Sequence, residues 1–337
     1  MLNNKKVVFS KEMTIELWTE EFDENKLCGS EVVIKNHYSF ISSGTELACL
    51  YGKEASWFKF PEVPGYCSAG EIIAKGADVS GFSIGDMVFY YGGHRLYNVI
   101  DLNEEICIRL IDGLKPEYAP FARIATIAIT SLRQSDIELG DYVIVAGLGA
   151  VGNMAAQLAQ LQGAKVIGFD LDKKRLLKAK ECGIDCVHKF DNEGIVPIIE
   201  EVTSGHMADS FIDATGRTAT TLDFLPAIKK GGEAILLGTP RDSYMADATK
   251  ILRAVHLIDS NIKFKSALEW NYPVKHSEFI KHSFESNTHV VFELIRDNKL
   301  KIAPFITHFI KPEQAEEAYN GLINNPNEYL GVMFDWK

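Results

Sequence analysis

The pattern of hydrophobic and polar positions changes near residue 116. Before this point, short apolar runs such as 31–35, 70–73 and 86–89 are separated by Gly and Pro turns, which predicts a β-rich region. After it, apolar runs alternate with segments of helical period, which predicts βαβ units and a parallel, doubly wound sheet. The predicted strands are 142–146, 165–169, 210–213, 234–237 and 261–264, and the predicted helices are 117–134, 150–161, 173–182 and 218–229.

The C-terminal part returns to a mixed pattern. A long helix is predicted near 276–297, a strand near 305–310, a helix from 312 to 324 and a final strand at 330–334. A chain of 337 residues exceeds the size at which a single core usually stops growing, so two domains are expected. The predicted fold class is therefore α/β, with a β-rich part and a doubly wound parallel sheet.

The segment between the strands 142–146 and 165–169 carries the most specific motif. Here Gly147-Leu148-Gly149-Ala150-Val151-Gly152 forms Gly-x-Gly-x-x-Gly between a strand and a helix. Gly147 permits the tight turn, Gly149 lets the backbone approach a pyrophosphate, and Gly152 lets the helix pack closely on the strand. The helix N-terminus adds free N–H groups and the positive end of a dipole. The motif predicts a dinucleotide site.

Asp170 ends the next strand, about 20 residues after the turn, where an acid accepts hydrogen bonds from a ribose 2′-OH and repels a 2′-phosphate. The run Lys173-Lys174-Arg175 suggests a 2′-phosphate site instead, but Asp170 in front of it disfavours that interpretation. We therefore predict NAD as the cofactor, with NADP the weaker alternative and Arg175 near the adenosine ribose.

Composition narrows the class of partner. The 35 Lys and Arg against 46 Asp and Glu leave a formal net charge of −11, which argues against nucleic acid or an anionic membrane. No apolar run approaches the roughly 20 residues of a membrane span. Six scattered cysteines are too few for a disulfide scaffold, and the first residues are unlike a signal peptide. We expect a cytoplasmic protein that acts on a small molecule.

Several motifs, in order along the chain, resemble the medium-chain dehydrogenase/reductase superfamily. Residues 63–72 (VPGYCSAGEI) resemble V-P-G-H-E-x-A-G-x-V, 82–88 (FSIGDMV) resemble F-x-x-G-D-x-V, and 331–336 resemble the terminal strand. The resemblance implies a discontinuous GroES-like catalytic domain (1–122 and 270–337) and a Rossmann cofactor domain (123–269). It also implies that Thr215 and Gly238 flank the nicotinamide, and that the protein is a homodimer or homotetramer.

The chain departs from this family at the metal. Zinc-dependent members use a Cys in C-G-T-D, the His of G-H-E, and an acid or Cys before the glycine turn. Ser43, Tyr66 and Arg123 stand at these positions. A hydroxyl, a phenol and a guanidinium are not zinc ligands. The four-Cys lobe of a structural zinc is also missing, because 90–110 contains one cysteine. We predict that the protein needs no zinc.

Without zinc, a hydrogen-bond donor must polarise the substrate oxygen. Tyr66 is the main candidate; as a base near neutrality it would need its pKa of about 10 lowered, which Arg123 could achieve. By resemblance, Thr45 would relay a proton, Glu46 would serve the proton path or a structural pairing, and Ser43 would contact substrate. The alternatives are that Tyr66 only fills the vacated volume and that Arg123 pairs with an acid.

The substrate and its pocket are less sharply predicted. The aromatic residues Tyr51, Trp57 and Trp270, together with His94, are candidates for the pocket walls, against an ordinary core or surface role for each. S-S-G-T-E with V-P-G-Y resembles a zinc-independent subgroup that includes bacteriochlorophyllide hydroxyethyl dehydrogenases and sugar or cyclitol dehydrogenases. The resemblance implies oxidation of a secondary alcohol, or reduction of its ketone.

Two other functions remain open at this stage. One is a zinc-free quinone or enoyl reductase, which would act on a C=C bond; such enzymes usually prefer NADPH and lack the Thr-Glu pair, so Asp170 and Thr45-Glu46 count against it. The other is a non-catalytic dinucleotide-binding relative. Against decay of the site, polar residues and not apolar ones occupy the three ligand positions.

Overall fold

The structure is a computed structural model that describes residues 1–24, 26–190 and 194–337. It divides into two compact units. The β-rich unit comprises Met1–Ile124, Val274–Asn298 and Phe305–Lys337, and the parallel-sheet unit comprises Ala125–Pro273 and Lys299–Pro304. The family resemblance implied boundaries at 122/123 and 269/270, without the short return of 299–304 to the parallel-sheet unit.

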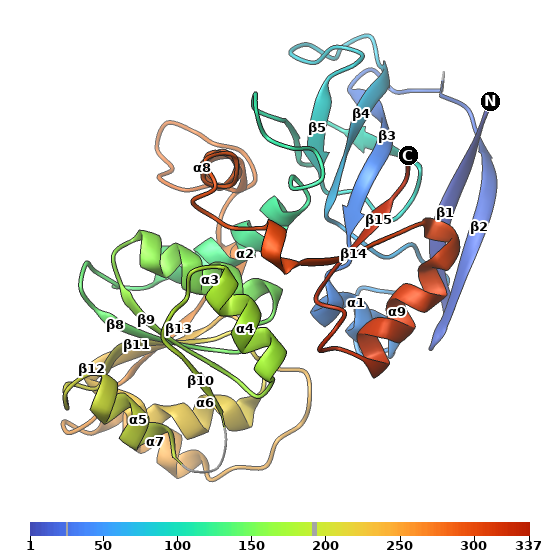
Figure 1. The fold of residues 1–337 in the computed structure, drawn as a ribbon. Helices are drawn as coiled ribbons and strands as arrows, with labels where there is room; N and C mark the ends of the chain where they lie inside the picture. The colour runs from blue at the N-terminus through green and yellow to red at the C-terminus, as the bar shows by residue number, and fades with distance from the viewer. Residues whose placement is uncertain (25, 191–193) are drawn as a thin grey trace. The chain divides into compact units, whose positions relative to one another are not determined.

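The parallel-sheet unit is a doubly wound Rossmann fold (Figure 1). Its strand order β10-β9-β8-β11-β12-β13 reverses direction between β8 and β11. Figure 1 shows α3 and α4 on one face of this sheet and α5, α6 and α7 on the other. The elements are α2 (Phe121–Gln134, which begins in the β-rich unit), β8 (Tyr142–Ala146), α3 (Ala150–Leu161), β9 (Lys165–Asp170), α4 (Lys173–Glu181), β10 (Val187–Lys189), α5 (Ile195–Val202), β11 (Ala208–Asp213), α6 (Thr218–Phe224), β12 (Ile228–Leu236), α7 (Ala248–His256) and β13 (Lys263–Ser266). Ligands of such folds bind at the carboxyl ends of the strands, where the order reverses.

The core of this unit explains why its strands read as continuous apolar runs. Ile144, Ile167, Phe169, Phe211 and Phe224 are buried in one cluster. The rings of Phe211 and Phe224 stack with their centroids 5.0 Å apart. Because helices cover both faces of the sheet, side chains on both sides of each central strand are buried.

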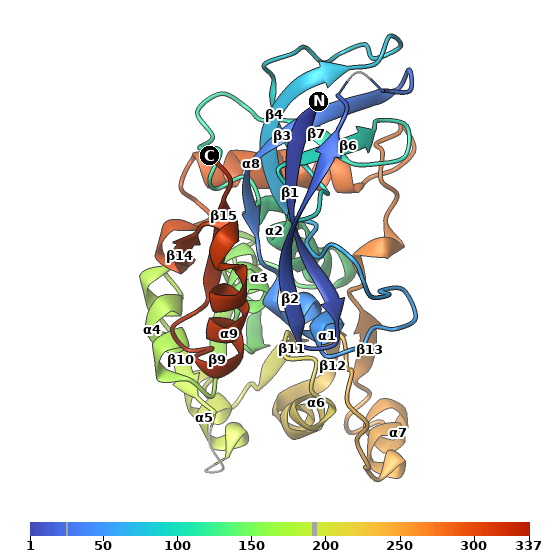
Figure 2. The same ribbon diagram turned by 90° about the vertical axis from the view of Figure 1, so that its right-hand side faces the viewer.

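The β-rich unit is built on a mixed sheet in the order β14-β15-β3-β4-β5-β7, with β6 also paired to β3. β14 and β15 are parallel, and the other pairs are antiparallel. The hairpin of β1 and β2 forms a separate antiparallel ribbon, seen along its length in Figure 2. The elements are β1 (Leu2–Lys11), β2 (Thr14–Phe22), β3 (Glu31–Phe40), α1 (Ser43–Leu50), β4 (Ser68–Lys75), β5 (Met87–Tyr90), β6 (Tyr97–Asp101), β7 (Cys107–Arg109), α8 (Phe284–Arg296), β14 (Ile306–Ile310), α9 (Ala315–Asn324) and β15 (Gly331–Asp335).

The last part of the chain belongs to the β-rich unit because it completes the core of that unit. β15 pairs with β3, with Met333 opposite Phe40. Tyr319 of α9 makes an edge contact with Phe9 of β1, with ring centroids 5.0 Å apart. Both rings are fully buried. The N-terminal hairpin and the C-terminal helix therefore share one hydrophobic cluster.

Some elements differ from the sequence pattern. The helix expected near 276–297 begins only at 284, because the Ser283 side chain accepts the Ser286 N–H and closes a capping box there. The helix expected over 218–229 ends at 224, since the chain turns into a 3₁₀ segment and enters β12 at Ile228. The segment S-S-G-T-E falls on the start of α1, a helix that the pattern did not predict.

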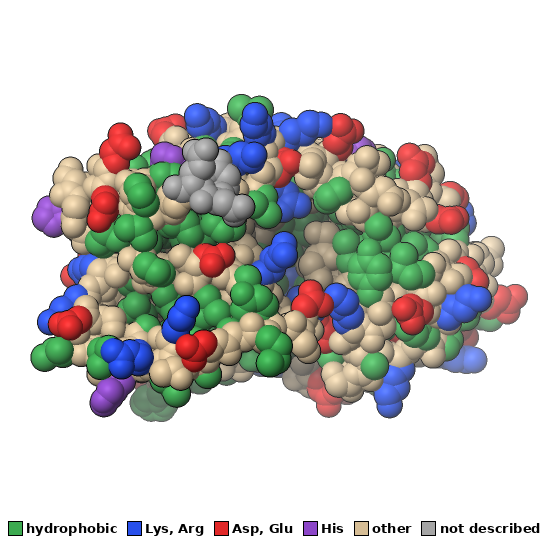
Figure 3. Space-filling view, turned by 90° about the horizontal axis from the view of Figure 1, so that it is seen from below, with side chains coloured by type: hydrophobic (Ala, Val, Ile, Leu, Met, Phe, Trp, Pro, Cys, Tyr) green, Lys and Arg blue, Asp and Glu red, His purple; other side chains and the backbone are tan. Residues whose placement is uncertain are grey.

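The surface is of mixed character. On the face drawn in Figure 3, acidic and basic side chains are interspersed with hydrophobic ones. In the part of the chain that the structure describes, no helix is long and apolar enough to cross a membrane.

Candidate functional site

The glycine turn has the backbone geometry that the motif predicts. Gly147 has a φ of +84°, which favours glycine, and a Cβ added to Gly152 would lie 1.7 Å from the Gly147 carbonyl oxygen. Gly149 precedes Ala150 and Val151, the first residues of α3, and a Cβ there would meet nothing within 4 Å. The first and third glycines are therefore needed by the fold, whereas Gly149 leaves open space beside the backbone.

A cavity of about 240 Å³ opens beside this turn, within the parallel-sheet unit. Gly147 and Gly149 line it together with Asp170, Arg175 and Thr215. The structure thus brings these predicted cofactor residues together around one cavity. Gly238 follows β12, and a Cβ on it would lie 2.3 Å from the Gly216 nitrogen, so only glycine fits there. These residues fit the pyrophosphate and adenosine ribose of a bound dinucleotide.

Asp170 is held in a fixed orientation at the end of β9. Its Oδ2 accepts the Leu148 N–H at 2.8 Å and lies 3.9 Å from Arg175 Nη1, and its Oδ1 accepts the Asp172 N–H at 2.9 Å. The residue is 6% exposed. Leu148 therefore contributes its backbone N–H, while its side chain is buried. An anchored carboxylate on the cavity wall suits a ribose diol and opposes a 2′-phosphate.

The predicted catalytic residues Thr45, Tyr66 and Arg123 lie in the β-rich unit and form a second group. The Tyr66 phenol donates a hydrogen bond to Ser42 Oγ at 2.5 Å, and the Thr45 hydroxyl also bonds the phenol. The guanidinium carbon of Arg123 lies 5.1 Å from the Tyr66 ring centre and 4.4 Å from that of Tyr91. We call Ser42, Thr45, Tyr66, Tyr91 and Arg123 the donor cluster. Ser43, at the first position of α1, is half-buried.

The electrostatics of Tyr66 correct one expectation. Burial raises the pKa of the Tyr66 phenol above its usual value of 10.0, and this effect exceeds the opposing influence of the Arg123 charge and of the hydrogen bonds to Ser42 and Thr45. The expectation that Arg123 brings this pKa down toward neutrality is therefore wrong. At neutral pH the phenol is protonated, which makes it a hydrogen-bond donor and not a base.

Glu46 and His94 lie in the interior of the β-rich unit. The two Glu46 carboxylate oxygens accept the Ser42 N–H at 2.7 Å, the Tyr319 hydroxyl at 2.5 Å and His94 Nε2 at 3.0 Å. Glu46 thus has the structural pairing that was the alternative to a proton path. The expectation that His94 lines a substrate pocket is wrong: the side chain is fully buried, and Ser39 and Glu46 occupy both its ring nitrogens.

The aromatic candidates for pocket walls lie at the surface. Tyr51 at the end of α1 is 37% exposed, Trp57 is 58% exposed, and Trp270 in the parallel-sheet unit is 60% exposed. Trp57 donates its indole N–H to Glu54 at 2.9 Å. Their assignment to a substrate pocket stays a prediction.

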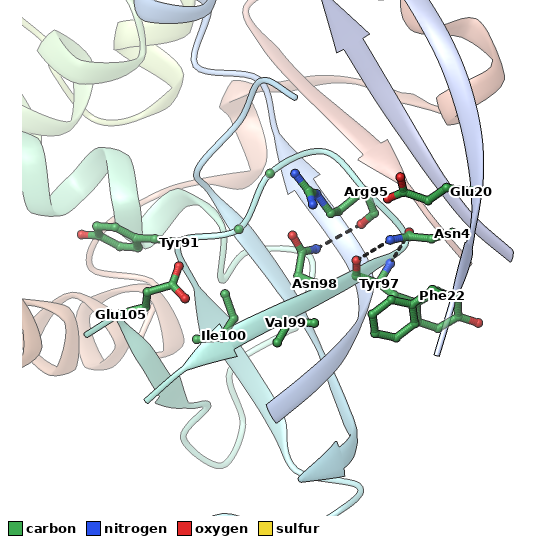
Figure 4. Close-up of a pocket in the computed structure, with 12 residues that line it drawn as sticks. Asn4, Glu20, Phe22, Tyr91, Arg95, Tyr97, Asn98, Val99, Ile100 and Glu105 are labelled. Carbon is green, nitrogen blue, oxygen red and sulfur yellow. Dashed lines mark hydrogen bonds between the residues drawn. The ribbon is translucent and has the colours of Figure 1, made fainter. Parts of the chain in front are cut away.

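A second cavity, also of about 240 Å³, lies in the β-rich unit (Figure 4). Asn4 bridges to both backbone polar groups of Tyr97, and Asn98 donates to the Arg95 carbonyl oxygen. Tyr91 of the donor cluster forms part of its wall. Because these amide side chains already bond to the protein, we assign no ligand to this cavity.

Sequence reasoning missed three residues of the site: Ser42, Tyr91 and Tyr319. Ser42 was within reach, since it is the first serine of S-S-G-T-E and immediately precedes a helix. Tyr91 and Tyr319 belong to no motif, and only the packing of distant segments brings them beside Arg123 and Glu46.

The residues at the zinc positions do not fit zinc. Ser43, Tyr66 and Arg123 offer a hydroxyl, a phenol and a guanidinium, whereas zinc in proteins is bound by thiolate, imidazole and carboxylate. Across residues 1–24, 26–190 and 194–337, no group of three or more His, Cys, Asp or Glu side chains could hold a metal ion.

The fold defines the class of protein: an α/β protein with the architecture of medium-chain alcohol dehydrogenases. Galactitol-1-phosphate dehydrogenase from Escherichia coli superposes with a TM-score of 0.84 at 18% identity, covering 98% of this chain and 99% of that one. An E. coli alcohol dehydrogenase in complex with NADH superposes with a TM-score of 0.81 at 17% identity, covering 99% of each chain.

The sequence comparisons find similar proteins among the zinc-type dehydrogenases. Residues 150–276 match the family model of zinc-binding dehydrogenases. D-guloside 3-dehydrogenase from E. coli is 23% identical over 93% of this chain and 96% of its own length. An uncharacterized zinc-type alcohol dehydrogenase-like protein from Haemophilus influenzae is 27% identical over 70% of this chain, and the match spans 64% of that protein. The chain is thus similar to medium-chain, zinc-type alcohol dehydrogenase-like proteins, several of which are named as polyol or sugar dehydrogenases.

Proposed function

We propose that this protein is a zinc-independent, NAD-dependent dehydrogenase that interconverts a secondary alcohol and its ketone. The observation that carries the proposal is the donor cluster. Where zinc-dependent relatives place metal ligands, this chain places a protonated phenol and a guanidinium, with the Ser42 and Thr45 hydroxyls hydrogen-bonded to the phenol. The anchored carboxylate of Asp170 supports NAD over NADP.

In this mechanism Tyr66 replaces the Lewis acid. Its O–H, reoriented from Ser42, donates to the substrate oxygen and stabilises the negative charge that develops there. The permanent charge of Arg123 over the Tyr66 ring favours the same negative charge. Alcohol oxidation also releases a proton, and the Thr45 and Ser42 hydroxyls offer a path along which that proton can pass from the substrate oxygen to solvent, or back in ketone reduction. The glycine turn, Asp170 and Thr215 would hold NAD⁺, which would supply the hydride acceptor when bound.

We propose a polyol, sugar or cyclitol as the substrate class. The support is that a relative matched over nearly its whole length is a D-guloside 3-dehydrogenase, and that galactitol-1-phosphate dehydrogenase shares the fold. A quinone or enoyl reductase is disfavoured, because Asp170 opposes the 2′-phosphate of NADPH.

A substrate screen combined with metal analysis tests the proposal. We expect NAD⁺ reduction with at least one compound in a panel of polyols, cyclitols, glycosides and sugar phosphates. Protein purified without chelator should contain well under one zinc per chain, and its turnover should survive treatment with a chelator. Stoichiometric zinc with chelator-sensitive turnover would overturn the metal-free mechanism. Reduction of quinones or enoyl compounds, with no activity on alcohols, would overturn the reaction class.

A further inference from the structure

Behind the donor cluster lies a network that we call the buried network: Ser39, Glu46, His94, Tyr319 and Trp336. We propose that Glu46 and His94 are positioning residues for Tyr66. Glu46 fixes the hydrogen-bond partner of the phenol, and His94 fixes the backbone that carries it. The inference rests on the proposed function, in which the Tyr66 hydroxyl is the donor. It adds a role for two residues that lie too deep to contact a substrate, since they are 2% and 0% exposed.

Glu46 controls the partner of the phenol. A serine that precedes a helix usually caps it by accepting a backbone N–H of the first turn. The Ser42 side chain makes no such bond at the start of α1. Glu46 instead reaches back and accepts the N–H of Ser42 itself at 2.7 Å. Ser42 is thereby fixed through its backbone, while its Oγ accepts the Tyr66 hydroxyl at 2.5 Å.

His94 controls the backbone that carries the phenol. The backbone N–H of His94 donates to the Pro64 carbonyl oxygen at 2.8 Å. Its ring lies against Gly65, where an added Cβ would be 2.7 Å from His94 Nε2. Gly65 also has a φ of +96°, so the chain immediately before Tyr66 is held in a conformation that suits glycine.

The buried network links Glu46, which holds Ser42, to His94, which packs on Gly65. Within it each hydrogen-bond donor has an acceptor. Trp336 Nε1 donates to Ser39 Oγ at 2.9 Å, and Ser39 Oγ lies 2.7 Å from His94 Nδ1. The Ser39 proton can therefore go to Nδ1, and His94 Nε2–H donates to Glu46, which also accepts the Tyr319 hydroxyl. A buried carboxylate is costly unless its lone pairs are satisfied, and when they are, the network has one favoured geometry.

The test measures the environment of Tyr66 directly. Fluorotyrosine is incorporated at position 66, and its fluorine NMR signal is recorded in the unaltered chain and in the variants Tyr319→Phe and Glu46→Gln. Tyr319→Phe removes one buried hydroxyl from Glu46, and Glu46→Gln keeps an acceptor for Ser42. The matched control is Tyr90→Phe, which also removes the hydroxyl of a buried tyrosine in the β-rich unit, one that accepts a hydrogen bond from Asn98. Circular dichroism checks that every variant folds.

We expect the fluorine signal to shift or broaden in both network variants and to stay unchanged in Tyr90→Phe. An unchanged signal in the network variants, or an equal change in the control, would overturn the inference. This readout needs no substrate, so it is independent of the proposed function.

A double-mutant cycle then tests whether the buried network affects turnover through Tyr66. We expect Tyr319→Phe to lower kcat about fivefold in the unaltered chain and to have no effect on kcat once Tyr66 is already Phe. The KM for NAD⁺ should not change. Equal losses in both backgrounds would mean a merely structural role and would overturn the inference. If Tyr66→Phe itself keeps full turnover while the fluorine signal responds, the proposed donor fails and the positioning of the ring stands.

Discussion

The pKa of Tyr66 shifts in the direction opposite to the one that its charged neighbour Arg123 suggests. A guanidinium beside a phenol lowers the pKa of the phenol, but here burial outweighs the charge and raises that pKa. The protonated phenol can polarise an oxygen without giving up its own proton in the ground state. A residue with this property can replace the electrostatic role of a metal ion.

The first prediction concerns this donor. Tyr66→Phe should lower kcat by roughly 10²–10³, the usual cost of one preorganised donor, while NAD⁺ affinity and the fold stay unchanged. Thr45→Val should cost less, because water can partly replace a relay. Steady-state kinetics on the substrate found in the screen, with cofactor titration, measures both effects. Full turnover in Tyr66→Phe would show that the ring only occupies volume.

The second prediction concerns Asp170. Asp170→Ala should narrow the preference for NAD over NADP by about 1–3 kcal/mol, because NAD loses a charge-assisted acceptor and NADP loses a repulsive charge. Asp172→Ala is the control: it removes the carboxylate that caps α4 through the N–H groups of Lys174 and Arg175. In this control the ratio of NAD affinity to NADP affinity should stay the same. Fluorescence titration with both cofactors measures this, and equal affinities in the unaltered protein would refute the assignment.

At the scale of elements, close packing of α3 on the glycine turn positions the residues of the proposed cofactor cavity. α3 starts at the glycine turn, and its approach to the Gly147 carbonyl leaves no room for a side chain at position 152. Asp170 at the end of β9 then ties the turn down through the Leu148 N–H. The glycine turn and Asp170, which line one side of the proposed cofactor cavity, thus belong to one β8–α3–β9 unit, which is why a short motif can predict them.

The third prediction separates the two functions of this turn. Gly152→Ala should lower the free energy of unfolding by about 1–3 kcal/mol, because its Cβ would collide with the Gly147 oxygen. Gly149→Ala should change that free energy by less than about 0.5 kcal/mol, since its Cβ meets nothing within 4 Å, yet it should weaken NAD⁺ binding. Denaturant titration and cofactor titration of both variants measure the contrast. A destabilised Gly149→Ala that keeps full affinity would contradict it.

At the scale of the whole molecule, partly and fully buried ionisable groups of the β-rich unit make its stability depend on pH. Burial raises the pKa of Tyr66, Tyr90 and Tyr319 above the usual 10.0, and it raises the pKa of Cys107 from 9.0 to about 12. In each case the folded state holds a proton that the unfolded chain releases at lower pH. Stability is therefore complete below about pH 9 and is lost as pH rises above the unfolded values.

The fourth prediction follows from that sign. The free energy of unfolding should be nearly constant from about pH 7 to pH 8.5 and should fall steadily above about pH 9. Cys107→Ala should make the decline between about pH 9 and pH 10 shallower, because the usual pKa of 9.0 for a cysteine lies below the 10.0 of the tyrosines. Unfolding with guanidinium chloride at a series of pH values measures how the free energy of unfolding depends on pH. A constant free energy up to about pH 11 would contradict the assignment.

The sequence by itself determined the features that depend on neighbours along the chain. The βαβ alternation, the glycine turn and the acid after the second strand specify the parallel-sheet unit and its cavity, because each is a local pattern of backbone and spacing. The substitutions Ser43, Tyr66 and Arg123 are also visible directly, so the poor fit to zinc needs no structure.

The tertiary structure alone decided the features that depend on distant segments. Burial, and not Arg123, sets the direction of the Tyr66 pKa, because desolvation depends on everything packed around the ring. Glu46 pairs with Tyr319, which lies in the C-terminal helix α9, and His94 turns inward to Glu46 and Ser39. No spacing along the chain encodes these partners, since folding brings together side chains from β3, α1, a loop and α9.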